Sequence, residues 1–303
     1  MTSLPPGVVR TPRSRFAGLP EWGFAPQHLR IKDLPDAPGG LRIHYVEHGE
    51  GSPVLMLHGE PSWSYLYRRM LGPIGQQHRA LAFDFVGFGR SDKLTDIKAY
   101  TYELHRQTLV GVIEKLDLRD ITLVVQDWGG LLGLPVAALD VPERISRLVI
   151  MNTFLPTGEE TASPAFRAWK KTAALLGTRL PVGLTMKAAL PKRQASFVRG
   201  YTAPFPSAQH KAGVAAWPLL VPTSPGGPVS DVMREARAAL RTWDKPCLLV
   251  WSPQDPILGG LAGFFERLIP TASPAIEVRG GHFLQDASGA QIAQHILEFM
   301  AEA

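Results

Sequence analysis

The sequence predicts an α/β protein whose mostly parallel β-sheet carries an inserted helical segment. Short apolar or alternating runs, bounded by glycine and proline, recur along the chain in the pattern of β-strands. Helical patterns separate several of these runs, and strands that alternate with helices indicate a parallel sheet covered by helices on both faces. The alternation stops between residues 155 and 228 and then resumes. We therefore expect a twisted sheet covered on both faces, with an inserted helical cap.

Seven runs are predicted as strands, and they are Leu41–Val46, Pro53–Leu57, Ala80–Phe85, Ile121–Val125, Arg147–Met151, Pro246–Trp251 and Ala275–Val278. Four segments have helical periodicity, and they are Tyr100–Leu116, Leu131–Leu139, Val232–Trp243 and Ile292–Met300. Residues 1–154 and 229–303 together form the predicted core domain. Residues 155–228 are rich in Pro, Gly, Ala and aromatic side chains and contain no strand-like run, so we predict that they form the cap.

The composition is that of an ordinary globular protein, because 45% of the 303 residues are hydrophobic and 19% are charged. The formal charge is +5, but the basic residues are scattered, which argues against a nucleic-acid partner. A membrane span needs about 18 consecutive uncharged apolar residues, and the sequence contains no such run, so we expect a cytoplasmic protein. The single cysteine, Cys247, lies in an apolar run, and we expect it in the core. Neither a metal nor a cofactor is expected.

The turn at residues 126–130, Gln-Asp-Trp-Gly-Gly, lies between an apolar run and an apolar helical pattern. This is the pattern of a nucleophile elbow, in which the central residue sits at the carboxyl end of a strand and small residues allow strand and helix to pass closely. Asp127 occupies the central position. An aspartate before a helix often only caps it. The rest of the sequence favours a nucleophile.

Two further residues complete a predicted catalytic triad. Asp255 follows the run Pro246–Trp251, and His282 follows Ala275–Val278. The chain order nucleophile, acid, histidine is that of the α/β-hydrolase fold. Taken alone, Asp255 could be a turn residue and His282 a structural histidine. Together with Asp127 they predict nucleophile, orienting acid and general base.

An oxyanion hole is predicted from the turn that follows the early strand Pro53–Leu57. In this fold a backbone N–H from that turn acts together with the N–H of the residue after the nucleophile, which points to Glu60 and Trp128. Glu60 would act through its backbone. His58 in the same turn is expected to brace it.

A carboxylate nucleophile narrows the chemistry to displacement at saturated carbon, because the ester that forms can then be hydrolysed by water that His282 activates. The leaving group would be a halide or an epoxide oxygen. A halide needs only hydrogen bonds, and indole N–H groups donate without accepting. Trp128 directly follows Asp127, and Trp169 and Trp217 lie in the predicted cap.

Over nearly its whole length the sequence resembles the haloalkane dehalogenases, subfamily I. The matching stretches are His58–Arg68, Asp84–Asp92, Thr122–Gly130, Phe166–Trp169, Ala203–Pro206 and Gly281–Gln285. The resemblance implies Asp127 as nucleophile, His282 as base and Asp255 as acid. Another subfamily keeps the acid after the strand that follows the elbow helix, where this chain has Met151-Asn152-Thr153 and no carboxylate.

The resemblance also implies a halide site and a substrate pocket. Trp128 and Trp169 would hold the halide, whereas Trp217 is expected to pack. An apolar wall would be formed by Phe166, Pro218, Val221 and Leu258. The expected partners are a small halogenated alkane, water and a halide ion, the product is a primary alcohol, and we expect a monomer.

Three alternatives remain open at this point. An epoxide hydrolase shares the aspartate nucleophile but uses two cap tyrosines, and Tyr201 is the only one of the six tyrosines within the insertion. Fluoroacetate-type dehalogenases have an arginine where this chain has Val86. A luciferase-like oxygenase or a ligand-binding relative could share the scaffold.

Overall fold

The computed structural model describes residues 4–32, 34, 37, 39–190 and 196–302. Its strands are β1 (Val8–Val9), β2 (Gln27–Ile31), β3 (Leu41–His48), β4 (Pro53–Leu57), β5 (Arg79–Phe83), β6 (Lys93–Leu94), β7 (Ile121–Gln126), β8 (Ile145–Met151), β9 (Cys247–Trp251) and β10 (Ile276–Glu277). Eight of them form one sheet in the order β10-β9-β8-β7-β4-β5-β3-β2. All neighbours from β10 to β5 run parallel, whereas β3 pairs antiparallel with both β5 and β2. The predicted mostly parallel α/β fold is confirmed.

The centre of the sheet explains why its strands are nearly continuous apolar runs. Every residue of β7 and β9 is buried, and so are the last four of β4 and of β8. A strand covered by helices on both faces has no solvated side on which polar residues could alternate with apolar ones. Cys247, the first residue of β9, is buried in this core as predicted.

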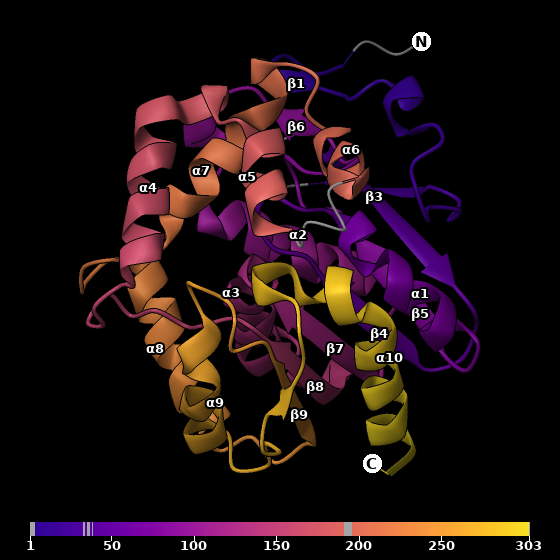
Figure 1. Ribbon diagram of the computed structural model, residues 1–303, viewed down its shortest axis with the longest axis vertical. Helices are drawn as coiled ribbons and strands as arrows, with labels where there is room; N and C mark the ends of the chain where they lie inside the picture. Colours follow the sequence, from indigo (N-terminus) through magenta and orange to yellow (C-terminus); the bar gives the residue numbers. More distant parts are fainter. Residues whose placement is uncertain (1–3, 33, 35–36, 38, 191–195, 303) are drawn as a thin grey trace.

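Two groups of helices flank the sheet (Figure 1). In the first group, α1 (Arg68–Gly75) packs against α10 (Leu284–Glu302). In the second group, α3 (Trp128–Pro135) packs against both α2 (Tyr102–Lys115) and α8 (Pro228–Leu240). Helix α9 (Ala262–Leu268) lies against β9. No helix in the described part of the chain is long and apolar enough to cross a membrane.

The segment predicted as the cap is helical where it is described. Its helices are α4 (Pro164–Leu176), α5 (Val182–Ala189), α6 (Val198–Thr202) and α7 (Ala212–Leu220). They gather in the upper part of Figure 1, on the side of the sheet towards which β7 leads into α3. Helix α4 packs on α7, and α5 packs on α6. The division into a core and a cap domain stays a prediction.

Some element boundaries differ from those predicted. The elbow helix begins at Trp128, whereas Leu131 was predicted. The first turn, Trp-Gly-Gly, was missed because its two glycines give no apolar periodicity. The helix ends at Pro135, and residues 136–140 form a wider π-helical turn. The short strand β2 was not predicted. It lies at the edge of the sheet, pairs only with β3, and shows a burial pattern too exposed to give an apolar run.

Candidate active site

The carboxyl ends of five parallel strands bring the predicted residues together. Residues 58–60 follow β4, Asp127 follows β7, Asn152 follows β8, Asp255 lies in the loop after β9, and His282 lies in the loop after β10. Because these strands are parallel neighbours, their carboxyl ends meet at one edge of the sheet. Residues that are more than 200 positions apart in the sequence thereby share one site.

Asp127 sits at a sharp turn between β7 and α3, with φ 50° and ψ −122°. Few residues with a side chain adopt a positive φ, and the surroundings must hold it there. A Cβ at Gly129 would lie 2.1 Å from the Leu57 carbonyl oxygen, and one at Gly130 would lie 2.1 Å from Thr153 Oγ1. The two glycines therefore let α3 pass close to the neighbouring strands, as an elbow requires.

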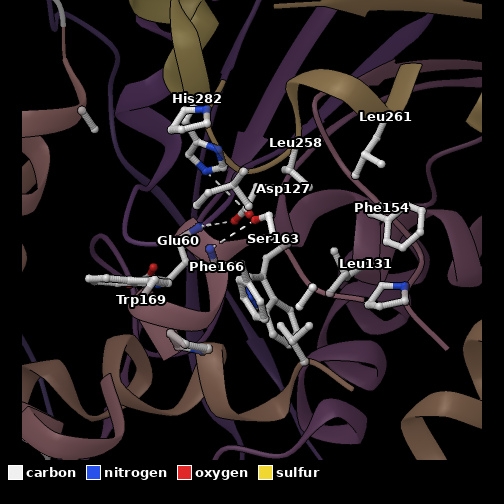
Figure 2. A pocket seen from close by; sticks show the side chains of 18 of the residues that line it. Glu60, Asp127, Leu131, Phe154, Ser163, Phe166, Trp169, Leu258, Leu261 and His282 are labelled. Atoms are coloured by element: carbon white, nitrogen blue, oxygen red, sulfur yellow. Dashed lines mark hydrogen bonds and ion pairs between the residues drawn. The ribbon is translucent and has the colours of Figure 1, made fainter. Parts of the chain in front are cut away.

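The Asp127 side chain does not cap α3 in the described structure. Its Oδ1 accepts a hydrogen bond of 2.8 Å from the backbone N–H of Glu60, and the backbone N–H of Trp128 also donates to the carboxylate. Figure 2 shows the carboxylate pointing into the cavity. The two N–H groups predicted for an oxyanion hole thus converge on this side chain.

His282 lies between the two acids. Its Nδ1 is 2.9 Å from Oδ2 of Asp255, and its Nε2 is 3.7 Å from Oδ2 of Asp127. The first distance is a hydrogen bond, which fixes the imidazole and leaves Nε2 directed at Asp127. The structure therefore brings the three predicted triad residues into one line.

Asp255 is held by a network that sequence reasoning missed. Asn152 donates through Nδ2 to Oδ2 of Asp255 at 3.1 Å and to the Ser252 carbonyl at 2.9 Å, while its Oδ1 accepts from the Ser252 N–H at 2.7 Å. The other oxygen of Asp255 accepts from the backbone N–H of Ile257 at 2.8 Å. Asn152 occupies the place where the other subfamily has its acid. Its position directly after β8 was the available signal.

His282, Asp127 and Asp255 shift one another's pKa values. Burial lowers the pKa of His282, but the carboxylates of Asp255 and Asp127 outweigh that effect and raise it to about 9. Burial raises the pKa of Asp127, opposed by His282 and by the two N–H groups of Glu60 and Trp128. For Asp255, burial is outweighed by His282 and the local hydrogen bonds, so its pKa is lowered. The two carboxylates thus favour the protonated form of His282, which lies between them.

A cavity of about 640 Å³ opens in front of Asp127, between the strand ends and the helices of residues 155–228. All four predicted wall residues line it, namely Phe166, Pro218, Val221 and Leu258. Asp127, His282, Glu60, Trp128 and Trp169 line it as well. Sequence reasoning missed several apolar members, which include Leu131, Phe154, Ile257, Leu261 and Phe283. Phe154 and Ile257 lie in loops shortly after strands, which was a usable signal.

Trp128 is backed by a buried aromatic stack. The Trp217 ring lies 4.8 Å from that of Trp128 at an interplanar angle of 27°, and its indole N–H donates to His105 at 2.7 Å. Trp217 is fully buried and does not belong to the cavity lining. The prediction that Trp217 packs is therefore confirmed, and its contact supports the ring of Trp128.

Trp169 lies on α4 and reaches the cavity beside the side chain of Glu60 (Figure 2). The indole is close enough to the Glu60 carboxyl group to lower its pKa.

His58 and Tyr201 have structural surroundings. Phe85 donates its backbone N–H to Nε2 of His58, and Nδ1 donates to the Gly59 carbonyl at 3.0 Å, so His58 braces the turn as predicted. Tyr201 lies outside the cavity lining and binds Asp286 and Arg68 through its hydroxyl. The one tyrosine of the insertion therefore does not face Asp127 as an epoxide hydrolase would require.

Comparison with known families identifies the fold. The family model of the alpha/beta hydrolase fold matches residues 52–287, a span that contains all residues of the site described above.

Individual relatives extend over nearly the whole chain. A haloalkane dehalogenase of Mycolicibacterium paratuberculosis is 43% identical over 298 residues and covers 96% of this chain and 98% of its own. The tetrameric structure of haloalkane dehalogenase DpaA from Paraglaciecola agarilytica NO2 matches with a TM-score of 0.88 at 32% identity, covering 95% of this chain and 97% of that one. A cis-3-alkyl-4-alkyloxetan-2-one decarboxylase of Shewanella oneidensis is 32% identical over 277 residues, with coverage of 87% and 86%.

Proposed function

Because the chain belongs to the haloalkane dehalogenases of the α/β-hydrolase fold, we propose that it hydrolyses the carbon–halogen bond of small haloalkanes to a primary alcohol, a halide and a proton. The observation that carries this proposal is an elbow carboxylate, Asp127, that faces an apolar cavity beside His282 and two indoles. An apolar cavity desolvates the carboxylate and strengthens it as a nucleophile.

In the first step, Asp127 displaces the halide from the substrate carbon. Its Oδ1 is held by the Glu60 N–H, so we assign the attack to Oδ2. The carbon–oxygen bond forms as the carbon–halogen bond breaks, and the halide leaves with the electron pair. The product is an alkyl ester of Asp127 whose carbonyl oxygen, the former Oδ1, stays with the two N–H groups.

In the second step, water hydrolyses this ester. His282 takes a proton from the water, whose oxygen attacks the carbonyl carbon of Asp127, and Asp255 stabilises the imidazolium that forms. The negative charge of the tetrahedral intermediate develops on the oxygen that faces the N–H groups of Glu60 and Trp128. Collapse of the intermediate breaks the bond to the alkoxide, which takes the proton from His282 and leaves as the alcohol, and Asp127 is regenerated as a carboxyl group that then loses its proton.

We assign the departing halide to the indole N–H groups of Trp128 and Trp169, which lie on the cavity surface together with Asp127. Indole N–H groups stay neutral at every accessible pH and cannot accept a proton from the solvent, so they suit an anion in an apolar site. The wall residues Phe166, Pro218 and Val221 would contact the alkyl chain.

The direct test is to incubate the protein with 1-bromobutane and follow bromide and acid, with styrene oxide in parallel. We expect bromide, 1-butanol and one proton per turnover. Formation of diol from the epoxide without bromide release would contradict the proposal. One relative is named as a decarboxylase of an oxetan-2-one, which is a β-lactone, so a β-lactone should be tested as a third substrate. Turnover of the lactone without turnover of 1-bromobutane would also contradict the proposed function.

The remaining expectations are part of the same proposal. Residues 155–228 would form the cap that closes the cavity over the core of residues 1–154 and 229–303. A cytoplasmic monomer stays a prediction, and the DpaA structure is described as tetrameric. Gel filtration with light scattering would decide the oligomeric state.

A further inference from the structure

Glu60 has an unusual side chain for a residue that is expected to act through its backbone. Its N–H donates to Asp127, yet its carboxyl group lies on the cavity wall and only 6% of the residue is exposed. Burying a carboxyl group is unfavourable unless it is hydrogen-bonded or neutral. The side chain therefore needs an explanation of its own.

The surroundings of the Glu60 carboxyl group are incompletely satisfied. Its buried Oε1 has no hydrogen-bond partner among the described residues. The Trp169 indole lies beside the group (Figure 2), and the carboxylate of Asp127 is close enough to raise its pKa. In the part of the chain that the structure describes, no cation pairs with Glu60. A buried acid beside a second carboxylate and without a cation is stable only with a proton.

We propose that the protonation state of Glu60 controls the affinity of the cavity for the halide. When Glu60 is neutral, the cavity can hold the anion. When Glu60 is ionised, its carboxylate binds the Trp169 N–H and repels the anion. The inference rests on the proposed dehalogenase function. Within it, Glu60 is a positioning residue that acts on the halide through the Trp169 donor and through its charge.

Electrostatics supports both halves of this proposal. Burial raises the pKa of Glu60 well above its ordinary value, and the charge of Asp127 raises it further, opposed by the Trp169 indole. Burial and the neighbouring carboxylate thus both favour the neutral form of Glu60. An ionised acceptor forms a stronger hydrogen bond than a neutral one, so deprotonation would hold the Trp169 indole more tightly. It would also place a second negative charge in a cavity of low dielectric constant.

The other titratable groups on the cavity wall differ from Glu60. Asp127 and His282 neutralise each other as an ion pair. Glu160 also lines the cavity but pairs with Arg237, so its charge is compensated. Glu60 is thus an unpaired acid on this wall, and below the His282 pKa of about 9 its ionisation is what adds negative charge near a bound halide.

The dependence of halide binding on Glu60 protonation bears on product release. Each turnover releases one halide and one proton, and the proton first appears on the regenerated carboxyl group of Asp127. A halide that binds best when Glu60 carries a proton leaves more readily once that proton is lost. Halide release would then be faster at a pH at which Glu60 is ionised.

The test measures bromide affinity from tryptophan quenching between pH 6 and 9, without turnover. For the natural protein we expect the dissociation constant to rise with pH, by up to about tenfold per pH unit above the Glu60 midpoint. Glu60→Gln keeps the backbone N–H, the size and a neutral carbonyl, and should bind bromide with little pH dependence between pH 6 and 8, where His282, with its pKa of about 9, keeps its proton. The matched control is Glu160→Gln, which changes a paired acid on the same wall and should keep the natural slope.

A second measurement does not depend on how a variant folds. Titration calorimetry of the natural protein with bromide, in two buffers of different protonation enthalpy, should show proton uptake that increases between pH 6 and 8, below the His282 pKa of about 9. Zero uptake would overturn the proposal, as would equal pH slopes for the natural protein and folded Glu60→Gln. Both results leave dehalogenation intact. Absence of both bromide quenching and bromide release from 1-bromobutane would instead refute the proposed function itself, and the proposed role of Glu60 with it.

Discussion

Nε2 of His282 lies 3.7 Å from Oδ2 of Asp127, while its Nδ1 is hydrogen-bonded to Asp255 at 2.9 Å. The charge of Asp127 is one of the causes that raise the pKa of His282 to about 9. Alkylation of Asp127 removes that charge, so the pKa of His282 falls when the ester forms. The imidazole would then lose its proton and become a base at the moment when a base is needed.

His282→Gln should separate the two steps of the proposed reaction. Displacement of the halide needs only Asp127, whereas hydrolysis needs a base, so the ester should accumulate. We expect intact-protein mass spectrometry to show an increase equal to one butyl group after exposure to 1-bromobutane. Asp127→Ala treated in the same way is the control and should show none. Unmodified protein in the His282→Gln sample would argue against His282 as the hydrolytic base.

Asp127→Ala should abolish bromide release, because no other carboxylate lies at the elbow. Bromide binding should persist, since Trp128 and Trp169 remain. Bromide release by ion chromatography and quenching by added bromide are the two measurements. Residual turnover at more than a small fraction of the natural rate would move the nucleophile elsewhere.

Trp169→Phe should weaken bromide binding, because it removes one N–H donor and keeps most of the aromatic surface. A hydrogen bond to a charged group contributes about 1.5–3 kcal/mol, so the bromide dissociation constant should rise by about ten- to hundredfold. Trp22→Phe is the matched control, because Trp22 packs on Trp63 and Tyr65 outside the cavity. Equal affinities for the two variants would assign the second donor to another residue.

Asn152→Asp tests the network behind Asp255. The new carboxylate would replace a donor that lies 3.1 Å from Oδ2 of Asp255, so a hydrogen bond becomes a repulsion. We expect a loss of about 1–3 kcal/mol in the free energy of unfolding near pH 8, measured in urea, and a smaller loss at pH 5 where one acid can be protonated. If the difference in free energy of unfolding between Asn152→Asp and the natural protein were the same at pH 5 and pH 8, this explanation would be wrong.

The pH dependence of stability follows from His282. Its pKa is about 9 in the folded protein, above the ordinary value of 6.5, so the folded state binds more protons between these values. The contribution is complete below pH 6.5 and is lost as the pH rises through 9, at a slope of up to about 1.4 kcal/mol per pH unit. Unfolding in urea at several pH values should show a shallower slope for His282→Gln. If the free energy of unfolding changed with pH at the same slope in both proteins, His282 would not be the cause of the pH dependence.

Much of the fold could be predicted because the central strands are buried on both faces. Strands such as β7 and β9 are apolar throughout, and this signal does not depend on distant residues. The edge strand β2 has mixed exposure and gains its structure from pairing with β3. No local pattern could have identified it.

The same contrast holds for the site. Asp127, Asp255 and His282 could be predicted because each follows a strand in a fixed chain order. The support of Asp255 by Asn152 depends on β8 lying between β7 and β9, which is a property of the sheet order. The contact between Glu60 and Trp169 joins a core loop to α4 and could not be predicted from either segment alone.

The backbone of Asp127 has one further consequence, which concerns assays rather than catalysis. Its φ of 50° is maintained by contacts from β4, α3 and Thr153, whose hydroxyl donates to the Asp127 carbonyl at 2.7 Å. An isolated turn would not hold that angle, so a chain that is only partly folded should contain an ordinary, unreactive aspartate. Alkylation of Asp127 by a bromoalkane would then count native molecules in a mixture, and the labelled fraction would report the yield of refolding.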